Sequence, residues 1–405
     1  MSESKPLALN SASVSRAGSR APRWTNTAGA WLGIGTSPGA LLVGAGIAAR
    51  YNGPVPLISI LLSFFLMFTV LWYQGQLGMA PPYGEGGDLN KITPHYFGSL
   101  MQRMIGAVIA IGMIGWFGFN VGLGGAALRA LLNLPAFAGP LLLGLPILIL
   151  SLMGMRSWNG LATLTTIAVL VLVALVVLRL SARMMPVTLS FTGPVDTIMD
   201  VAAFVGYISV FSVRAPDFTT NMVSRKDLGI LELLLCLPIL FIALAGVGLQ
   251  QGTGTMDLVG VLARQDGLPI GNVLITVAVI APTFTTLYSG APSLHSALGI
   301  QNRLGMVLIT VIGLALAIAR FDLWLISWVS VLAAMLPPLL VPLAVESSLR
   351  RRRATPRLIP IWVWLPGSIA SMILTLAKQP LAALIGLALS GIVTAGWYLF
   401  SQKKT

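Results

Sequence analysis

The stretch AWLGIGTSPGALLVGAGIAARY, residues 30–51, is apolar over the length of a membrane-spanning helix but is interrupted at its centre. Thr36 and Ser37 lie there between glycines and the pair Pro38 and Gly39. Proline and glycine release backbone groups from the helical hydrogen-bond pattern, and inside a bilayer those groups must be satisfied by protein, water or a bound ligand. The stretch therefore predicts a broken transmembrane helix, with Ser37 as a candidate ligand contact.

A second apolar stretch, VAAFVGYISVFSVRAPDF at residues 201–218, contains Gly206 and a centre rich in serine. We expect this helix to be interrupted as well. Interrupted helices at matching positions in the two halves of a chain are typical of inverted repeats with a binding site at the middle of the membrane.

The composition is that of a polytopic helical membrane protein. Of the 405 residues, 56% are hydrophobic and only 9% are charged, and the mean hydropathy is +0.88. The apolar runs are about twenty residues long, which is enough to cross ~30 Å of hydrocarbon. The net charge of +13 lies in the loops between these runs, so it indicates membrane topology and not a nucleic-acid partner.

Apolar runs bounded by charges, glycine and proline predict twelve transmembrane helices. They lie near residues 28–48, 54–79, 98–132, 138–155, 160–182, 196–215, 229–250, 268–298, 303–320, 322–346, 358–377 and 380–400. With a cytoplasmic N-terminus, 18 of the 25 Lys and Arg residues fall on the cytoplasmic side and 7 on the other. Because cytoplasmic loops are enriched in these residues, we expect both termini in the cytoplasm.

The two ends of the chain differ in composition from the apolar remainder. Residues 1–25 and 401–405 are expected to be cytoplasmic tails, the first of them disordered, because the beginning is basic, rich in serine and without the apolar segment of a signal peptide. Residues 26–400 are expected to form one transmembrane domain. The loops leave no room for a nucleotide-binding domain and no GxxxxGK[ST] stretch occurs, so ATP-driven transport by this chain is not expected.

The stretch GWFGFNVGLGG, residues 115–125, combines aromatic, amide and glycine residues inside an apolar run. Trp116 and Asn120 are four residues apart and share one face of a helix. An indole face and an amide edge suit a flat, polar aromatic ligand. The alternative is a tightly packed helix interface with Trp116 as filler, because glycines let helices approach closely. The glycines concerned are Gly112, Gly115, Gly118, Gly122, Gly124 and Gly125.

Three motifs carry a resemblance to a known family. GWFG at 115–118, APDFT at 215–219 and LAAMLPPLLVPLAVE at 332–346 resemble motifs of the nucleobase:cation symporter family, the purine and cytosine permeases and hydantoin carriers. They occur in the same order and at the family's spacing, and the likeness extends from about residue 25 to 400.

The resemblance implies a leucine-transporter-like architecture with alternating access. Two inverted repeats of five helices, at about 28–182 and 196–346, would be followed by two accessory helices at 358–400. The base would lie between spans one, three, six and eight, with Trp116 as the stacking residue and Asn120 where some members have an amide. A second aromatic from span six would fall at or beside Ile208, where Tyr207 is the nearest candidate and Ser209 follows.

The eighth span, APTFTTLYSGAPSLHSALG at 281–299, is where the resemblance implies hydroxyls for sodium and an Asn for the substrate. Thr285 and Thr286 are adjacent hydroxyls that, with carbonyls of the broken first span, would give the oxygen-rich shell of a hard cation. No Asn follows them, and Ser289 is the candidate polar contact. In the alternative, the threonines hydrogen-bond to carbonyls of their own helix.

Ionisable residues within the apolar runs are functional candidates because they are costly in lipid. Asp200 at the start of span six could load and release a proton, which would make transport proton-coupled. Alternatively, Asp196 and Asp200 stabilise the N-terminal turn of the helix. His295 is a pH-responsive candidate with a structural role as its alternative, and Glu232 lies in span seven.

Asp217, in the motif after span six, is expected either to pair with Arg214 or Arg225 or to belong to a solvated loop cluster.

These features predict a secondary transporter, not an enzyme, that imports a nucleobase or a related cytosine-, purine- or hydantoin-like heteroaromatic by cation symport. A carrier of the same fold for a vitamin precursor or an amino acid is the alternative. A membrane-embedded enzyme is a distant third, because His95 and His295 are far apart and no HExxH motif occurs. We expect no cofactor besides the coupling sodium or proton, a plasma or bacterial inner membrane location and, by default, a monomer. The single cysteine, Cys236, excludes an intramolecular disulfide.

Overall fold

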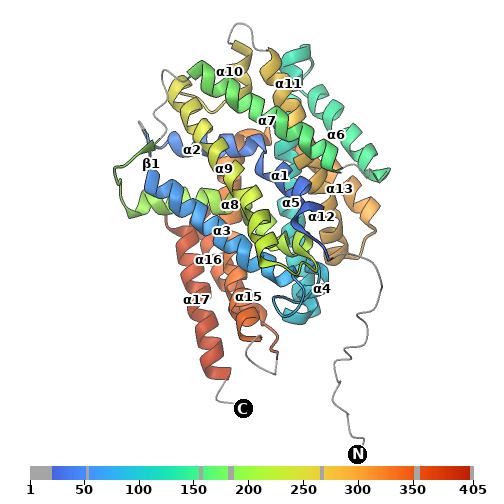
Figure 1. Ribbon diagram of the computed structural model, residues 1–405, viewed down its shortest axis with the longest axis vertical. Coiled ribbons are helices and arrows are strands. Elements are labelled where there is room, and N and C mark those ends of the chain that lie inside the picture. The colour runs from blue at the N-terminus through green and yellow to red at the C-terminus, as the bar shows by residue number, and fades with distance from the viewer. Residues whose placement is uncertain are drawn as a thin grey trace, which may run out of the picture.

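The computed structural model describes residues 21–51, 54–154, 158–180, 187–264, 269–350 and 356–401. It is a bundle of helices (Figure 1). Most of the predicted N-terminal tail and nearly all of the predicted C-terminal tail lie outside the described residues. The described part of the chain contains nine helical segments long and apolar enough to cross a membrane and three shorter apolar helices. The all-α polytopic membrane fold is confirmed, while the number of twelve crossings stays a prediction.

The helices follow the predicted apolar runs. The first ten predicted spans correspond to α1 (Ala28–Gly35) with α2 (Pro38–Ala48), α3 (Leu57–Gly78), α5 (Ser99–Leu132), α6 (Ala138–Leu152), α7 (Trp158–Leu180), α8 (Pro194–Thr219), α9 (Arg225–Thr253), α11 (Pro269–Ala278) with α12 (Ile280–Leu298), α13 (Asn302–Ile318), and α14 (Leu325–Met335) with α15 (Pro337–Arg350). The last two correspond to α16 (Leu365–Leu376) and α17 (Ala382–Ser401).

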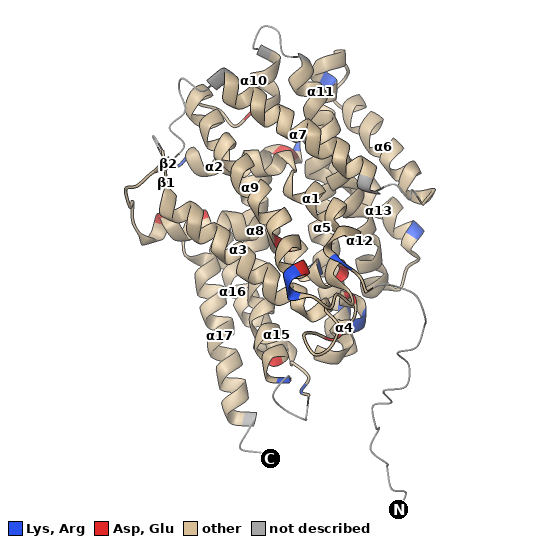
Figure 2. Cartoon of the chain, viewed as in Figure 1, with Lys and Arg blue, Asp and Glu red and all other residues tan. Residues whose placement is uncertain are grey.

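Short elements precede or connect these helices. They are η1 (Trp24–Asn26), α4 (Leu89–Tyr96), α10 (Leu258–Arg264), η3 (Phe321–Trp324), η4 (Ile361–Val363) and the parallel pair of β1 (Val55–Pro56) and β2 (Val187–Thr188), with Val55 opposite Val187. Charged residues gather around α4 and the adjoining helix ends, and long stretches of helix carry none (Figure 2).

The first span is broken where its sequence predicts. The helix α1 ends at Gly35 and α2 begins at Pro38. The Ser37 hydroxyl accepts a hydrogen bond from the Gly39 N–H at 3.3 Å and so caps α2. Thr36 donates to the Leu32 carbonyl at 2.8 Å and lies 3.1 Å from the Thr166 hydroxyl of α7. The hydroxyls of Thr36 and Ser37 thus satisfy part of the backbone at the break.

The predicted break in the sixth span is wrong, because α8 runs without interruption. The hydroxyls of Ser209 and Ser212 donate to carbonyls of their own helix, at 2.8 Å and 2.7 Å. Gly206 lets α14 approach: a methyl group there would lie 2.9 Å from the Val329 carbonyl carbon. The other interruptions fall in the eighth span, between α11 and α12, and in the tenth, where α15 begins at Pro337.

The helix pairing has the pattern expected of two repeats. The second half of the first span, α2, packs along α9, and α3 packs along α8. In two repeats of five spans, span one (α1 with α2) corresponds to span six (α8), and span two (α3) corresponds to span seven (α9). The contact of α2 with α9 is then equivalent to the contact of α8 with α3. The pairs α1 with α7 and α8 with α14 are related in the same way. The repeat boundaries themselves stay a prediction.

The central helix is α5, which contacts α6, α11, α12 and α13. Its glycines face different neighbours. The ring of Trp328 on α14 lies directly over Gly115, and a methyl group at Gly118 would lie 2.8 Å from Leu316 Cβ on α13. At Gly125 it would lie 2.7 Å from Pro140 Cα on α6. The packing role of the glycines is therefore confirmed. Because they have no side chain, α6, α13 and α14 can approach α5 closely around Trp116.

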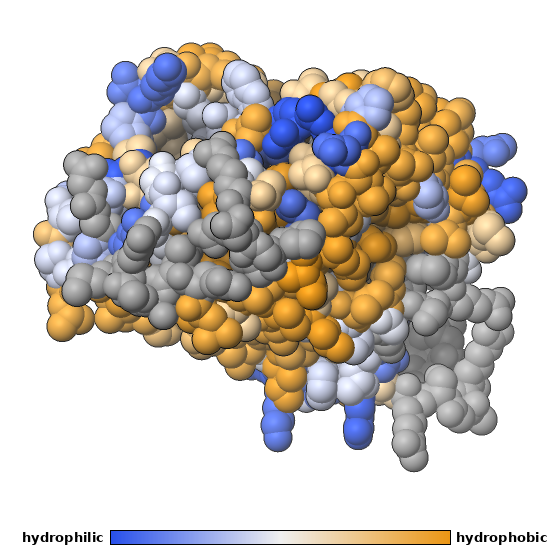
Figure 3. Space-filling view, turned by 90° about the horizontal axis from the view of Figure 1, so that it is seen from above, coloured by the Kyte–Doolittle hydropathy of each residue, from blue (hydrophilic) through white to orange (hydrophobic). Residues whose placement is uncertain are grey.

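The outside of the bundle suits a lipid environment. Phe65 is 62% exposed and Ile392 is 69% exposed, although both are large apolar residues. In the space-filling view of Figure 3, broad continuous areas are apolar and hydrophilic residues form separate patches. This distribution fits a multi-pass membrane protein.

Candidate functional site

Trp116 and Asn120 are buried at the centre of the bundle, each 2% exposed. The Trp116 indole lies 5.1 Å from the Tyr207 ring and 5.6 Å from the Phe119 ring, both nearly perpendicular to it. Phe211 lies 5.7 Å away at 43°. These centroid separations are those of favourable aromatic pairs. The site is therefore an aromatic cluster built from α5 and α8.

The cluster contains polar atoms without hydrogen bonds. Among the described residues, the Trp116 Nε1 donor and the Asn120 Oδ1 acceptor have no partner, although both atoms are buried. The same holds for Nε1 of Trp328, whose ring lies over Gly115. A buried polar group without a hydrogen bond typically costs about 1–3 kcal/mol. Native proteins keep such groups mainly where a ligand, an ion or water can satisfy them.

The broken first span touches this cluster. The Tyr207 hydroxyl is in hydrogen-bonding contact with the Ser37 side chain and the Ala40 backbone. A methyl group at Gly39 would lie 3.0 Å from Phe119 Cε1 and 3.1 Å from Tyr207 Cε2. The structure thus brings together Trp116, Tyr207 and Ser37, which the sequence had named as separate candidates.

The ring beside Ile208 that lies against Trp116 is that of Tyr207, the candidate named from the sequence, and Phe211 of the same helix adds another. Tyr207 and Phe211 are four residues apart, so one face of α8 presents both rings. Ile208 is fully buried but has no ring to stack, and the Ser209 hydroxyl is used within its own helix. Phe211 was not named from the sequence, although its spacing from Tyr207 is the signal that could have found it.

The proposed sodium ligands lie on α12. Thr285 donates to the Ala281 carbonyl at 3.1 Å and Thr286 to the Thr283 carbonyl at 2.6 Å, which is the alternative predicted for them. A methyl group at Gly33 would lie 3.5 Å from Ala281 Cβ, so α1 runs beside this part of α12. The described residues contain no group of three or more His, Cys, Asp or Glu able to hold a metal ion.

A cavity of about 330 Å³ separates α1, α8 and α12 on the side where α1 begins. It brings Thr285 and Ser289 together with the end of α8. Its lining residues are Asn26, Thr27, Ala30, Arg214, Asp217, Phe218, Thr285, Tyr288 and Ser289. The arrangement gives two of the predicted polar residues access to a polar opening next to the first half of the broken span.

Asp217 belongs to a network that closes this end of α8. It forms an ion pair with Arg214 and accepts a hydrogen bond from the Leu89 N–H at 2.8 Å. Arg214 Nη1 donates to the Ser293 hydroxyl of α12 at 3.2 Å. The predicted pair of Asp217 and Arg214 is confirmed, but both groups are largely buried within α8 and are not a solvated loop cluster. Arg225 instead lies 4.6 Å above the Tyr83 ring.

A second network joins the opposite end of α8 to α2. Asp200 is fully buried, forms an ion pair with Arg50 and accepts a hydrogen bond from the Tyr51 hydroxyl at 2.7 Å. Burial and this hydrogen bond raise the pKa of Tyr51 to about 12, so its hydroxyl stays a donor at neutral pH. Because Asp200 is in direct contact with the Arg50 guanidinium, its geometry is that of a structural ion pair and not of a carboxyl group that binds and releases protons. His295 is exposed, with Nδ1 2.7 Å from the Ile300 carbonyl.

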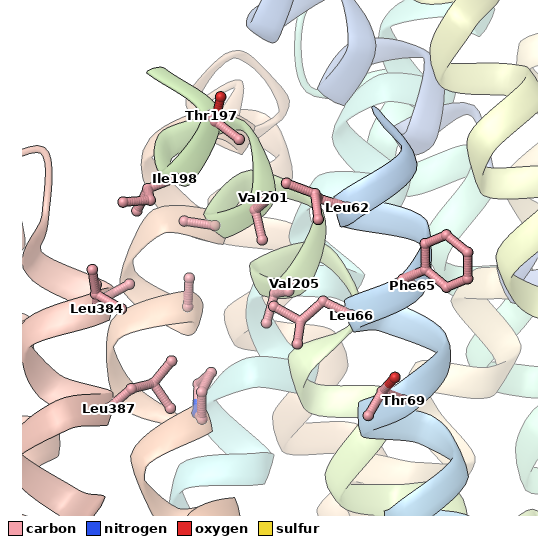
Figure 4. A pocket seen from close by; sticks show the side chains of 14 residues that line it. Leu62, Phe65, Leu66, Thr69, Thr197, Ile198, Val201, Val205, Leu384 and Leu387 are labelled. Carbon is pink, nitrogen blue, oxygen red and sulfur yellow. The ribbon is translucent and has the colours of Figure 1, made fainter. Parts of the chain in front are cut away.

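An apolar groove of about 420 Å³ lies elsewhere on the molecule, between α3, α8 and α17. Figure 4 shows Leu62 and Leu66 of α3 facing Val201 and Val205 of α8. Thr69 and Thr197 supply its only polar side chains. The groove lacks the donors and acceptors that a polar heteroaromatic requires, so the candidate site remains the cluster around Trp116.

No known family profile matches the sequence, and comparison with curated proteins finds no relative. Solved structures do match. The nucleobase-cation-symport-1 family transporter Mhp1, in a closed conformation with bromovinylhydantoin bound, superposes with a TM-score of 0.68 at 15% identity, covering 95% of each chain. The chain has the leucine-transporter fold.

Further solved structures with a similar fold are also transporters. The inward-facing conformation of Mhp1 gives a TM-score of 0.67 at 14% identity, covering 95% of this chain and 93% of that one. A Na⁺-coupled sialic acid symporter gives 0.59 at 16% identity, covering 94% and 90%. A manganese transporter of Eremococcus coleocola gives 0.55 at 13% identity, covering 91% and 90%. The resemblance suggested by the three sequence motifs is thus confirmed at the level of the leucine-transporter fold.

Proposed function

We propose that the protein is a secondary transporter that imports a flat heteroaromatic solute, such as a nucleobase or hydantoin, together with a cation. The observation that carries this proposal is that two buried polar atoms within the aromatic cluster, Trp116 Nε1 and Asn120 Oδ1, have no hydrogen-bond partner among the described residues. A flat ring with its own N–H group could stack on the indole face and donate a hydrogen bond to Asn120 Oδ1, whereas the indole N–H, which points out from the edge of its own ring, would be satisfied by an acceptor at that edge. The fold supports this reading, because Mhp1 was solved with bromovinylhydantoin bound.

The proposed mechanism links binding to the broken first span. In the structure, the rings of Tyr207 and Phe119 pack nearly perpendicular to the Trp116 indole. A ligand that stacks on the indole has to displace at least one of these rings. Because Tyr207 contacts Ser37 between α1 and α2, its displacement would act on the junction of the broken helix. Binding energy would thereby favour a different arrangement of α1, as alternating access requires.

The coupling cation is proposed to be sodium or a proton. For sodium, we propose Thr285 with carbonyls released at the break of the first span, since oxygen ligands suit a hard cation. The packing of α1 beside α12 at Gly33 and Ala281 supports this location. One protein of similar fold is a Na⁺-coupled symporter. Thr286 and Ser289 stay candidates for the same region.

We propose a cell-membrane location with both termini in the cytoplasm, based on the 18 to 7 distribution of the 25 Lys and Arg residues. In this orientation the cavity beside α1 opens toward the cytoplasm. The outer end of α8 is then the one joined to α2 through Asp200 and Arg50. We propose no enzymatic activity, and the similar structures named above are all transporters.

The second candidate function is a carrier of the same fold for a vitamin precursor or an amino acid. Trp116 would stack on the ring of such a vitamin equally well. An amino acid is less favoured, because the rings around Trp116 come from Phe119, Tyr207 and Phe211 and bring no ionised group to pair with a charged solute.

The deciding experiment is uptake into proteoliposomes of radiolabelled cytosine, adenine, hypoxanthine, uracil, hydantoin and allantoin, under a sodium gradient and then a proton gradient. We expect gradient-driven accumulation of at least one compound. Trp116→Ala should abolish it while the protein remains folded, and Trp362→Ala, at a residue 52% exposed on η4, should not. Undiminished uptake by Trp116→Ala would overturn the site, and no accumulation of any compound would favour the vitamin or amino-acid carrier.

A further inference from the structure

A carboxylate outside the aromatic cluster is buried and has no cationic partner among the residues that the structure describes. Glu232 on α9 is fully buried. Its Oε2 accepts a hydrogen bond from Trp31 Nε1 of α1 at 3.2 Å, and its Oε1 has no hydrogen-bond partner among the described residues. The helix α3 closes over that oxygen, because a methyl group at Gly75 would lie 2.8 Å from Oε1.

The described side chains packed around Glu232 provide no countercharge. The helix α9 packs against η1, α1, α2, α3 and α7. In the described side chains of these elements, the only ionisable group is that of Tyr73 on α3, which is 47% exposed. Arg214 and Asp217 of α8 are paired with each other. On α9 itself the ionisable groups are Cys236, one turn away, and the helix start with Arg225, Lys226 and Asp227.

An ionised carboxylate in such a place is costly, since burial removes its hydration and no ion pair replaces it. Two ways of removing the cost are open: the carboxyl binds a proton, or a mobile cation accompanies it. Within the described part of the chain one hydrogen bond reaches the group, whereas a bound metal cation would need several oxygen ligands. The geometry therefore favours the proton.

Trp31, which donates the hydrogen bond to Glu232, belongs to α1, the helix beside the cavity of about 330 Å³. The Trp31 ring packs on Phe218, with ring centroids 4.3 Å apart. Phe218 lines the cavity of about 330 Å³ together with Ala30, the residue before Trp31. The Thr27 hydroxyl donates to the Phe218 carbonyl at 2.9 Å. Movement of α1 away from α9 would therefore withdraw the indole N–H and open the carboxyl to this cavity.

We propose that Glu232 is the site that binds and releases the coupling proton. In the arrangement described, a proton forms an O–H bond at Oε1 and the group is neutral. When α1 moves and water enters from the cavity, this bond breaks, the proton passes to water and a carboxylate remains. This inference rests on the proposed transport function. It replaces Asp200, which is paired with Arg50, and His295, which is exposed.

The first test needs no substrate. Infrared difference spectra of the protein in lipid, recorded between about pH 4 and pH 10, report protonation of carboxyl groups from about the ordinary carboxyl pKa upward. We expect a titrating carboxylic-acid band that disappears in Glu232→Gln and persists in Glu85→Gln. Glu85 is the matched control, because it also has an aromatic donor, the Tyr96 hydroxyl at 2.7 Å. Identical titrating bands in Glu232→Gln and the unchanged protein would overturn the proposal.

The second test measures coupling with the compound that the uptake panel selects, in proteoliposomes containing the pH dye pyranine. We expect the unchanged protein to acidify the interior during uptake. Glu232→Gln should still exchange labelled for unlabelled compound but move no protons. Acidification by Glu232→Gln would refute the role of Glu232. Failure of the unchanged protein to exchange any compound would instead count against the proposed function. The infrared titration needs no transported compound, so it would still decide whether Glu232 binds and releases a proton.

Trp31→Phe provides a second variant if Glu232→Gln does not fold. It keeps an aromatic ring against Phe218 and removes the N–H that donates to Oε2. Since that hydrogen bond stabilises the ionised carboxylate, its loss should move the midpoint of the infrared titration upward by about one pH unit. An unmoved midpoint would contradict the assignment of the band to Glu232.

Discussion

At the scale of single residues, the Trp116 indole and the Asn120 amide each hold one buried polar atom without a protein partner. The remaining surface of the indole is covered by the rings of Phe119, Tyr207 and Phe211. Without a ligand this aromatic cluster lowers the stability of the fold, because its buried polar atoms have lost their hydrogen bonds to water and form none with the described residues. The same atoms give orientation and selectivity once a ring with matching groups is bound.

Asn120→Ala should therefore have opposite effects on binding and on stability. We expect the affinity for the transported compound to fall about tenfold to a hundredfold, the equivalent of ~1–3 kcal/mol for one hydrogen bond to a buried polar group. The melting temperature without ligand should be unchanged or higher, because an unpaired amide oxygen has been removed. Binding titration and thermal unfolding of the purified protein measure the two quantities. A lower melting temperature with unchanged affinity would assign Asn120 a structural role.

At the scale of elements, the junction of α1 and α2 and the neighbouring face of α8 form one unit. Gly39 at the start of α2 leaves room for Phe119 and Tyr207, and Tyr207 contacts Ser37 between the two helices. A side chain larger than glycine at this position has to move the rings of the candidate site. The position of α2 and the shape of the site are therefore coupled.

Gly39→Ala should impair binding far more than Gly33→Ala. The added methyl group would meet ring atoms of Phe119 and Tyr207 at 3.0–3.2 Å in the first variant. In the second it would make ordinary contacts of 3.5 Å and 3.7 Å with Ala281 and Ala162. We expect at least about a tenfold loss of affinity for Gly39→Ala, the size of a typical overpacking cost. Equal affinities of the two variants would show that the rings adjust freely.

At the scale of the whole molecule, two polar networks lie at opposite ends of α8. One joins Asp200 to Arg50 after α2, and the other joins Arg214 and Asp217 to α12 and to the start of α4. Both are formed in the structure, and Trp116 is buried between them. Breaking a buried ion pair by removing one partner typically costs about 3–5 kcal/mol. Loss of either network should therefore favour opening at its own end.

Asp200→Asn should open the outer end of the molecule. The natural cysteine, Cys236, is buried, so Cys236→Ala gives a background for a single reporter. Ser330→Cys would place this reporter in a cavity of about 290 Å³ that Arg50 also lines. We expect a membrane-impermeant maleimide added outside to label it faster in the Asp200→Asn variant. An unchanged labelling rate would mean that the network does not hold this end closed.

Asp217→Asn should open the inner end, by the same reasoning. The reporter here is Ala30→Cys, which faces the cavity of about 330 Å³ beside α1. Labelling of inside-out vesicles should become faster in the Asp217→Asn variant and should not respond to Asp200→Asn. If both substitutions increased the labelling rate equally, the bundle would be loosened as a whole, and the two networks would not hold their own ends closed independently.

The sequence by itself determined the positions of the apolar helices, the break at Thr36 and Ser37 and the shared face of Trp116 and Asn120. These depend on residues close together in the chain, through hydrophobicity, helical periodicity and the backbone chemistry of proline and glycine. It misjudged α8, where serine hydroxyls return to their own helix and Gly206 serves packing. Only the tertiary structure decided that Trp328 covers Gly115, that Arg50 pairs with Asp200 and that Trp31 reaches Glu232, 201 residues away. Such partners are chosen by the way whole helices pack, and no local pattern records that choice.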